Sequence, residues 1–149
     1  MNREIKFRGK CISDGEWLFG DLMHDNNGGS YVYPTESEGL YKKNAVFPDT
    51  VGQYTGLKDK NGVEIYEGDI LRSEGYAFRK DDCVPCYDIH EVVWDESNCA
   101  FSAVAWKRIV SGKEEQLTSF LYMLTDAEDC EVVGNVYDNP ELIGRTKNE

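Results

Sequence analysis

Histidine and long apolar runs are scarce in this sequence, and their scarcity excludes several kinds of function. The only histidines are His24 and His90, and neither belongs to a recognisable nucleophile–base motif. No stretch of about 18 apolar residues occurs, so no membrane-spanning helix and no membrane partner are expected. Residues 1–6 lack the apolar core and cleavage site of a secretory signal, which predicts a cytoplasmic protein.

Positive charge is also in short supply. The chain has 16 Lys and Arg residues against 28 Asp and Glu residues, a formal net charge of -12. Each contact with a nucleic-acid phosphate needs a cation, so direct nucleic-acid binding is not expected. The same acidity leaves a second hypothesis open, in which the protein mimics nucleic acid and occupies a DNA-binding host protein.

The five cysteines have no framework spacing, and an odd number of cysteines fits reduced thiols better than a disulfide scaffold. Cys83 and Cys86 have the CxxC spacing, and with His90 and Cys99 they could supply four zinc ligands. No second CxxC pair accompanies them. Packing residues and free thiols are therefore the favoured interpretation, and neither a metal nor another cofactor is predicted.

Strand-forming residues dominate the rest of the composition. Only six of the 149 residues are alanine, whereas 3 Trp, 9 Tyr and 6 Phe give 18 aromatics. This composition predicts a mainly β protein, and the length predicts a single domain over residues 1–149.

Alternation and turn signals locate several elements. Residues 4–8 predict a half-buried strand with Ile5 and Phe7 facing the core and Arg8 facing water. Residues 89–95 and 99–106 predict a hairpin whose aromatic side chains, including Trp94 and Trp106, anchor the core.

Three further segments carry weaker patterns. Residues 73–88 are polar and contain a proline, which predicts an irregular insertion. The spacing of Leu117, Phe120, Leu121 and Leu124 predicts a short helix, although the same residues alternate imperfectly as a strand. Residues 140–143 predict a final helical turn that begins at a proline and ends at Gly144.

The run from Thr50 to Ile70 is the most specific part of the chain. Its four glycines and its Asn61-Gly62 pair suit tight turns and barrel corners, and they lack the spacing of a phosphate-binding loop. Glu67 and Asp69 flank Gly68 in this run and could form an acid–base or metal-binding pair of a hydrolase. Turn formation explains the same residues without chemistry, so no catalytic residue is predicted.

Four segments together resemble the YopX family, which is encoded largely by phages, prophages and other mobile elements. The resemblance rests on residues 3–8, 20–22, 50–70 and 131–142. It implies a mainly β fold with a small SH3-like β-barrel, additional strands and one or two short helices. It carries over no catalytic residue.

Trp17, Phe19, Tyr54 and Tyr66 could form an aromatic binding platform, although a small barrel also needs large side chains to fill its core. The sequence thus favours a non-catalytic accessory module that binds an unknown host or phage protein. Exposed sheet edges also leave homo-oligomer formation open.

Overall fold

A computed structural model describes residues 2–34, 44–117, 121–124 and 127–146 of the chain. Strands take up 59% of it and helical turns 5%, which confirms the mainly β class. The elements are β1 (Phe7–Lys10), β2 (Trp17–His24), β3 (Ser30–Tyr33), β4 (Ala45–Val46), η1 (Pro48–Thr50), β5 (Gly52–Lys58), β6 (Glu64–Tyr66), β7 (Asp69–Arg79), β8 (Asp82–Asp95), β9 (Ala100–Val110), β10 (Lys113–Gln116), β11 (Leu121–Met123), β12 (Cys130–Asn135) and η2 (Pro140–Ile143).

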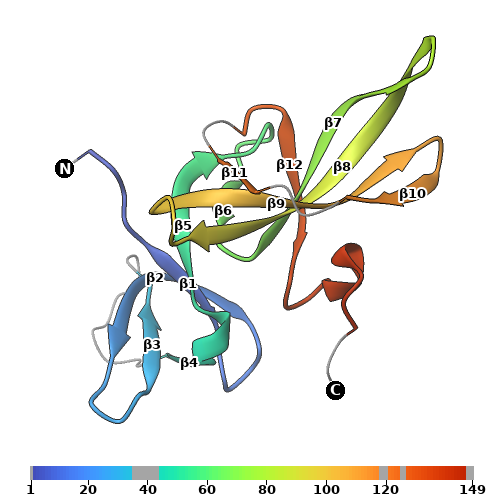
Figure 1. Ribbon diagram of the computed structural model, residues 1–149. Helices are drawn as coiled ribbons and strands as arrows, with labels where there is room; N and C mark the ends of the chain where they lie inside the picture. The colour runs from blue at the N-terminus through green and yellow to red at the C-terminus, as the bar shows by residue number, and fades with distance from the viewer. Residues whose placement is uncertain (1, 35–43, 118–120, 125–126, 147–149) are drawn as a thin grey trace. The chain divides into compact units, whose positions relative to one another are not determined.

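The strands form two antiparallel sheets, one of which is a half-barrel, and the chain divides into two compact units (Figure 1). Residues 1–56 make the first unit and residues 57–149 the second. The first unit has the strand order β4-β3-β2-β1-β5, and β5 runs across the boundary. Whether the two units act as one domain stays a prediction.

The first strand begins later than the alternation pattern predicts and presents different residues to the interior. Ile5 precedes β1 and is 40% exposed, whereas Arg8 is buried. The guanidinium of Arg8 lies 4.7 Å from the centre of the Trp17 ring. An aromatic face can accommodate a cation in this way, which charge alternation alone does not reveal.

Gly20, in the middle of β2, meets a backbone requirement that no other residue satisfies well. Its φ is +154°, and a Cβ atom placed on it would lie 1.8 Å from the carbonyl oxygen of Tyr33. That residue pairs with the next position of β2, Asp21. The contact between β2 and β3 therefore depends on the missing side chain.

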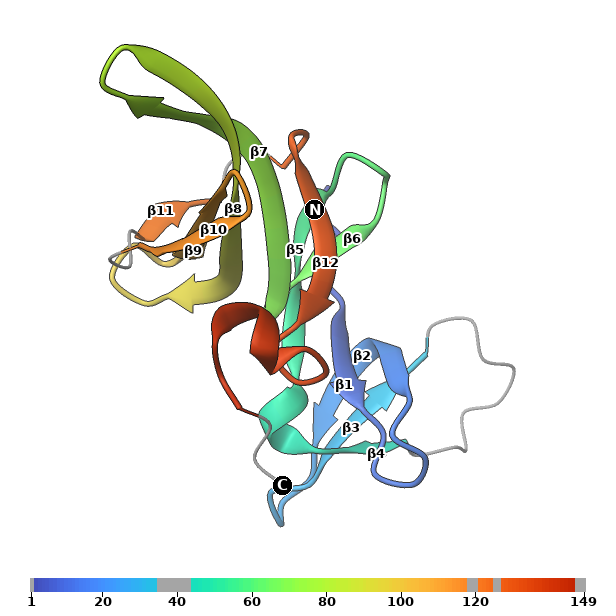
Figure 2. The ribbon, with the colours of Figure 1, turned by 90° about the vertical axis from the view of Figure 1, so that its right-hand side faces the viewer.

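The second unit contains a sheet with the order β10-β9-β8-β7-β12, and β11 pairs with β9. Its largest element is the β7–β8 hairpin, which extends well beyond β12 (Figure 2). The prediction of an irregular segment over residues 73–88 was wrong, because β7 and β8 pair without interruption from Ile70–Glu91 to Arg79–Asp82. Much of this part of the hairpin is exposed, so both of its faces carry polar residues that hide the strand periodicity.

The predicted helix over 117–124 was also wrong where the structure describes it. Residues 121–123 form β11 and pair with Ser102–Val104 of β9, while residues 118–120 lie outside the described residues. Pairing with an open strand edge has overridden a helical spacing only eight residues long. The final turn begins at Pro140 and ends at Gly144, which has φ +75°, as predicted, although it is a 3-10 turn.

Adjacent residues of β7 enter separate cores on the two faces of this sheet. Leu71 packs with Ile65, Val92 and Ala103, whereas Ile70 packs with a cluster that includes η2. The larger sets are Ile65, Leu71, Val92, Ala103, Leu124, Ala127 and Cys130 on one face, and Ile70, Ile89, Ile109 and Ile143 on the other. Two consecutive buried apolar residues are the mark of a strand covered on both faces.

The Asp59 carboxylate joins the turn before β6 to the last strand of the sheet. One oxygen accepts hydrogen bonds from the N–H groups of Asn61 (2.8 Å) and Val63 (2.9 Å), and the other accepts one from Val132 of β12 (2.9 Å). Burial raises the pKa of Asp59, but the three N–H donors and the charge of Lys60 outweigh it, so the pKa is lowered overall.

We expect Gly20→Ala to destabilise the protein by about 2–4 kcal/mol, because the new methyl group overlaps the Tyr33 carbonyl. Urea unfolding measures the change. Gly28→Ala is the matched control, since Gly28 also has positive φ but has nothing within 4 Å of the added Cβ. Equal losses in the two variants would show that steric overlap is not the cause.

Asp59→Asn should cost about 2–3 kcal/mol, because its amide group presents a donor where the carboxylate accepts from Val132. The folded-state pKa of Asp59 is depressed, so its stabilisation is present above the unfolded value of about 3.9 and is lost as pH falls through the folded value. Urea unfolding should therefore show the difference from wild type narrowing below about pH 4. Asp14→Asn should have a smaller effect, because Asp14 accepts one exposed backbone hydrogen bond, from Glu16.

Candidate functional site

Asp69 has a structural role, and Glu67 lies in a turn. Asp69 is 2% exposed, and its carboxylate accepts a hydrogen bond from the backbone N–H of Tyr66 at 2.8 Å. Glu67 and Gly68 form the turn between β6 and β7, with Gly68 at φ +84°. This is the turn chemistry that the sequence offered as the alternative to catalysis.

The four residues that were weighed as zinc ligands do not all converge. Cys83 lies near the tip of the β7–β8 hairpin, and Cys99 lies in the turn at the opposite end of β8. Nine residues of strand, on the order of 30 Å, separate Cys86 from the end of β8 at Asp95. Within the described ranges, no three His, Cys, Asp or Glu residues are grouped to hold a metal ion.

The four aromatics suggested as a binding platform do not share one exposure: Phe19 is 46% exposed and Trp17 is half-buried, whereas the two tyrosines are not exposed. Tyr54 and Tyr66 are buried, at 6% and 2% exposure, so they fill the interior. Trp94, expected in the core, is instead 45% exposed and packs edge-on against Phe101, with the ring centres 5.1 Å apart. The alternation of residue types located the strands, but it did not show which face of each strand is buried and which carries exposed aromatic side chains.

The structure instead brings aromatic and charged residues together on the outer half of the β7–β8–β9–β10 sheet. An open groove of about 440 Å³ runs along one face there; its lining includes Arg72, Glu74, Tyr76, Pro85, Tyr87 and Ile109. Strand pairing places Tyr87 opposite Glu74 and Ile109, so these side chains share a face. We call this hollow the hairpin groove.

A cation, Arg72, stacks on the Tyr87 ring in the hairpin groove. The Arg72 guanidinium lies 4.2 Å from the centre of the Tyr87 ring and 3.4 Å from the Glu74 carboxylate. A second hollow of about 320 Å³ also includes Arg72, Tyr87 and Ile109 and continues toward η2. The groove therefore combines an aromatic surface with charges of both signs.

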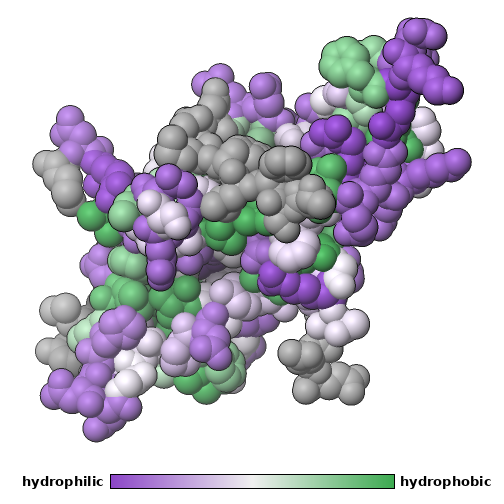
Figure 3. Space-filling model, in the orientation of Figure 1, coloured by the Kyte–Doolittle hydropathy of each residue, from purple (hydrophilic) through white to green (hydrophobic). Residues whose placement is uncertain are grey.

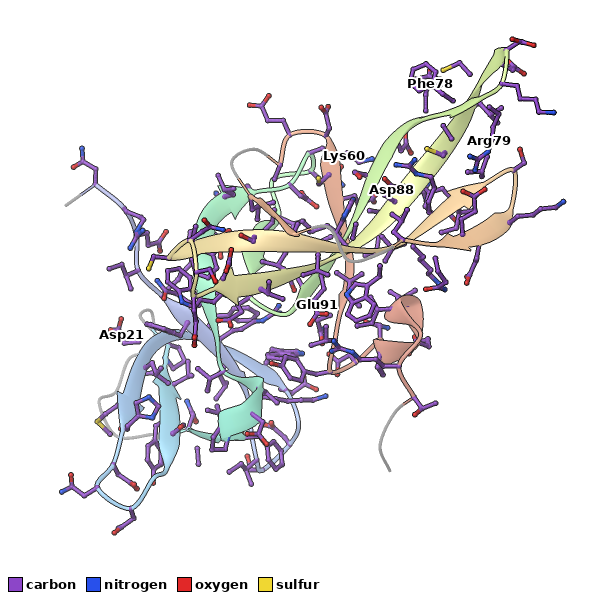
Figure 4. The ribbon with its side chains drawn as sticks, viewed as in Figure 1. Asp21, Lys60, Phe78, Arg79, Asp88 and Glu91 are labelled. Atoms are coloured by element: carbon purple, nitrogen blue, oxygen red, sulfur yellow. The ribbon has the colours of Figure 1, made fainter. Side chains whose placement is uncertain are left out.

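Exposed aromatics extend this surface toward the hairpin tip. Tyr76 and Phe78 are 65% and 83% exposed. Figure 3 shows apolar groups bordered by hydrophilic ones at the outer end of the hairpin, and Figure 4 shows Phe78 and Arg79 on opposite sides of it. This exposure could not be predicted while residues 73–88 were interpreted as irregular.

The opposite face of the same strands carries a polar network. Arg108 donates two hydrogen bonds of 2.7 Å to the carboxylate of Asp88, and these bonds raise the pKa of Arg108. Arg79 pairs with Glu115 farther out. Buried His90 lies within hydrogen-bonding distance of Ser73, with 2.7 Å between Nε2 and Oγ.

Burial lowers the pKa of His90; the negative charge of Asp88 opposes this shift and the positive charge of Arg108 adds to it. His90 therefore favours its neutral form inside the sheet. A buried imidazole within hydrogen-bonding distance of a serine suits a structural role.

A buried carboxylate at the inner end of the sheet fixes the C-terminal segment. Glu91 accepts a hydrogen bond from the Trp106 indole at 2.9 Å and pairs with Arg145 at 3.1 Å. Arg145 also stacks over Trp106, 5.0 Å from the ring centre. Arg145 follows Gly144 directly, and no sequence signal marked its role.

The fold and the groove define a small all-β protein in which no metal-binding group of His, Cys, Asp and Glu residues occurs among the described residues. The family model described as YopX protein matches residues 6–144. The chain therefore belongs to the YopX family. No curated protein matches the chain.

A solved structure supports the fold. The crystal structure of protein EF1440 from Enterococcus faecalis is 24% identical to this chain and has a TM-score of 0.51. The match covers 95% of this chain and 99% of that one. No described helix is long and apolar enough to cross a membrane.

Because the pKa of His90 is lowered in the folded state, the unfolded chain binds more protons below about pH 6.5. The contribution of His90 to stability should be complete above that pH and should decline as pH falls toward the folded value. Urea unfolding between pH 7.5 and 5 measures this loss. His90→Gln should flatten the pH dependence, and NMR titration of a His24→Gln variant should give a His90 pKa below 6.5. An unshifted His90 titration would contradict the prediction.

Proposed function

We propose that this YopX-family chain is a non-catalytic protein-binding module whose binding surface is the hairpin groove with the exposed aromatics beside it. The observation that carries the proposal is the exposure of Tyr76 and Phe78, at 65% and 83%, next to a groove lined by Tyr87 and Arg72. Large exposed aromatic groups are costly to leave in water and are enriched at protein interfaces.

The chemistry of the hairpin groove suits a polypeptide partner. Apolar side chains can enter over Tyr87 and Ile109, while Arg72 and Glu74 present charges of both signs at the border. Both signs of charge are present, which distinguishes the surface from the uniformly positive groove that a nucleic acid requires.

The acidity of the chain gives weaker support to the nucleic-acid mimic. Several carboxylates are engaged in ion pairs in the second unit, including Asp88 with Arg108, Glu114 with Lys107 and Glu131 with Lys60. Asp88 lies on β8 and Lys60 lies in the turn before β6, so these ion pairs are at different places in the second unit (Figure 4). These pairs reduce the unbroken negative surface that mimicry needs.

The YopX resemblance supports a cytoplasmic setting in a cell that carries a phage or another mobile element. The proposed partner is a host or phage protein. Glu67 and Asp69 have turn-forming roles, which weakens the hydrolase alternative.

Photocrosslinking in the producing cell tests the module directly. A photoreactive amino acid at the exposed Pro85 position should give a covalent adduct with another protein, whereas the same group at Val63 should not. Arg72→Glu, introduced together with the Pro85 label, should reduce the adduct at least fivefold, because it reverses the charge that stacks on Tyr87. Equal labelling from Pro85 and Val63 would overturn the proposed surface.

The identity of the adduct separates the two functions. A partner retained in the presence of duplex DNA supports the plain binding module. A DNA-binding partner that duplex DNA displaces would favour the mimic and overturn the module.

A further inference from the structure

The outer edge of β7 is only partly covered. Strand β12 pairs with β7 from Asp69 to Ser73, and within the described ranges no strand pairs with the outer edge from Glu74 to Arg79. An open edge presents backbone N–H and C=O groups that can pair with another strand. Six residues are long enough for such pairing.

The four middle residues of this edge lack the features that normally prevent pairing. Residues 75–78 are Gly-Tyr-Ala-Phe, without charge or proline. The opposite edge of the sheet, β10, has the sequence Lys-Glu-Glu-Gln, with three charges in four residues. Because charges and prolines discourage edge pairing, β10 is protected and β7 is not.

The side chains beside the open edge favour association. Tyr76 and Phe78 lie on one face of β7 and are among the most exposed large apolar residues described. Residues 74–82 contain Glu74, Asp81 and Asp82 against Arg79 and Lys80, a net charge of -3 + 2 = -1. Two such hairpins therefore meet without the repulsion that the whole-chain charge of -12 suggests.

We propose that β7 pairs with β7 of a second copy of this chain, antiparallel across a two-fold axis, so that Ala77 lies opposite Ala77 of the second copy. In an antiparallel pair, directly opposite residues share a face. This register places Tyr76 beside Phe78 of the second copy. Lys80, the first turn residue after β7, with φ +47°, then lies at the end of the ladder, where its long side chain can reach Glu74 of the second copy, and symmetry repeats both pairs.

The charges of Glu74 and Lys80 favour this register over the one shifted by one residue. Moving the axis to Tyr76 would place each Glu74 opposite Phe78 of the second copy and would lose the opposite-charge pair. The self-pairing concerns the strand edge and goes beyond the partner of the hairpin groove. Both proposals draw on the exposure of Tyr76 and Phe78, but the mass in solution and the cellular adduct test them separately.

Light scattering over a concentration series tests the pairing. The mass should rise from 17.0 kDa toward 2 × 17.0 = 34.0 kDa. E74K and K80E should each weaken dimer formation at least tenfold, because each places like charges together twice. An equimolar mixture of the two variants should restore the dimer, since in the mixed pair every new charge faces its opposite.

Ile12→Lys is the matched control, because Ile12 is 52% exposed in another turn and its replacement should leave the mass unchanged. Circular dichroism checks that all variants remain folded. A mass of 17.0 kDa at every concentration would overturn the proposal. A dimer that neither charge change weakens, or a mixture no better than the single variants, would overturn the register.

Discussion

The Asp59 carboxylate is the interaction on which the second unit depends. It holds a tight turn before β6 and reaches 73 positions along the chain to the N–H of Val132. Lys60 reinforces the same junction through its backbone N–H to Cys130 and its ammonium group to Glu131. Because β12 pairs with β7, this junction also holds the strand from which the long hairpin extends. A buried anion with three backbone donors is stable only when the whole junction is formed, which couples distant strands cooperatively.

Much of the architecture could be predicted from the sequence because it follows from local chemistry. The turn around Asn61-Gly62, the 140–144 turn and the hairpin between β8 and β9 all have short-range signals, and the YopX resemblance added the fold class. Asn61-Gly62 marked the turn that Asp59 begins, but the bond of Asp59 to Val132 was not predicted, since no local pattern identifies a partner 73 residues away. Residues 121–123 show the same limit, because their conformation depends on the edge of β9.

The candidate surface was predicted less well than the fold. The sequence directed attention to Tyr54 and Tyr66, which are buried, and away from Tyr76 and Phe78, which are exposed. All four residues are aromatic, so residue type alone does not distinguish the buried pair from the exposed pair. The difference arises from sheet topology. Strand β12 begins at Cys130, beside Ser73, and outward of this pair the hairpin has no neighbouring strand on that side among the described residues. For these two pairs, the extent of the sheet around them determines which aromatics meet water.

The register shift between Ile89 and His90 divides β8 into two parts that are constrained differently. Outward of it, Tyr87 must remain on the groove face and Asp88 on the face of Arg108. Deleting one residue from either β7 or β8 would move the residues beyond it to the opposite face of the sheet. Deleting one residue from each strand, at paired positions, would only shorten the hairpin. Insertions and deletions in this hairpin should therefore occur in even numbers, so that YopX relatives differ in its length by two, four or six residues.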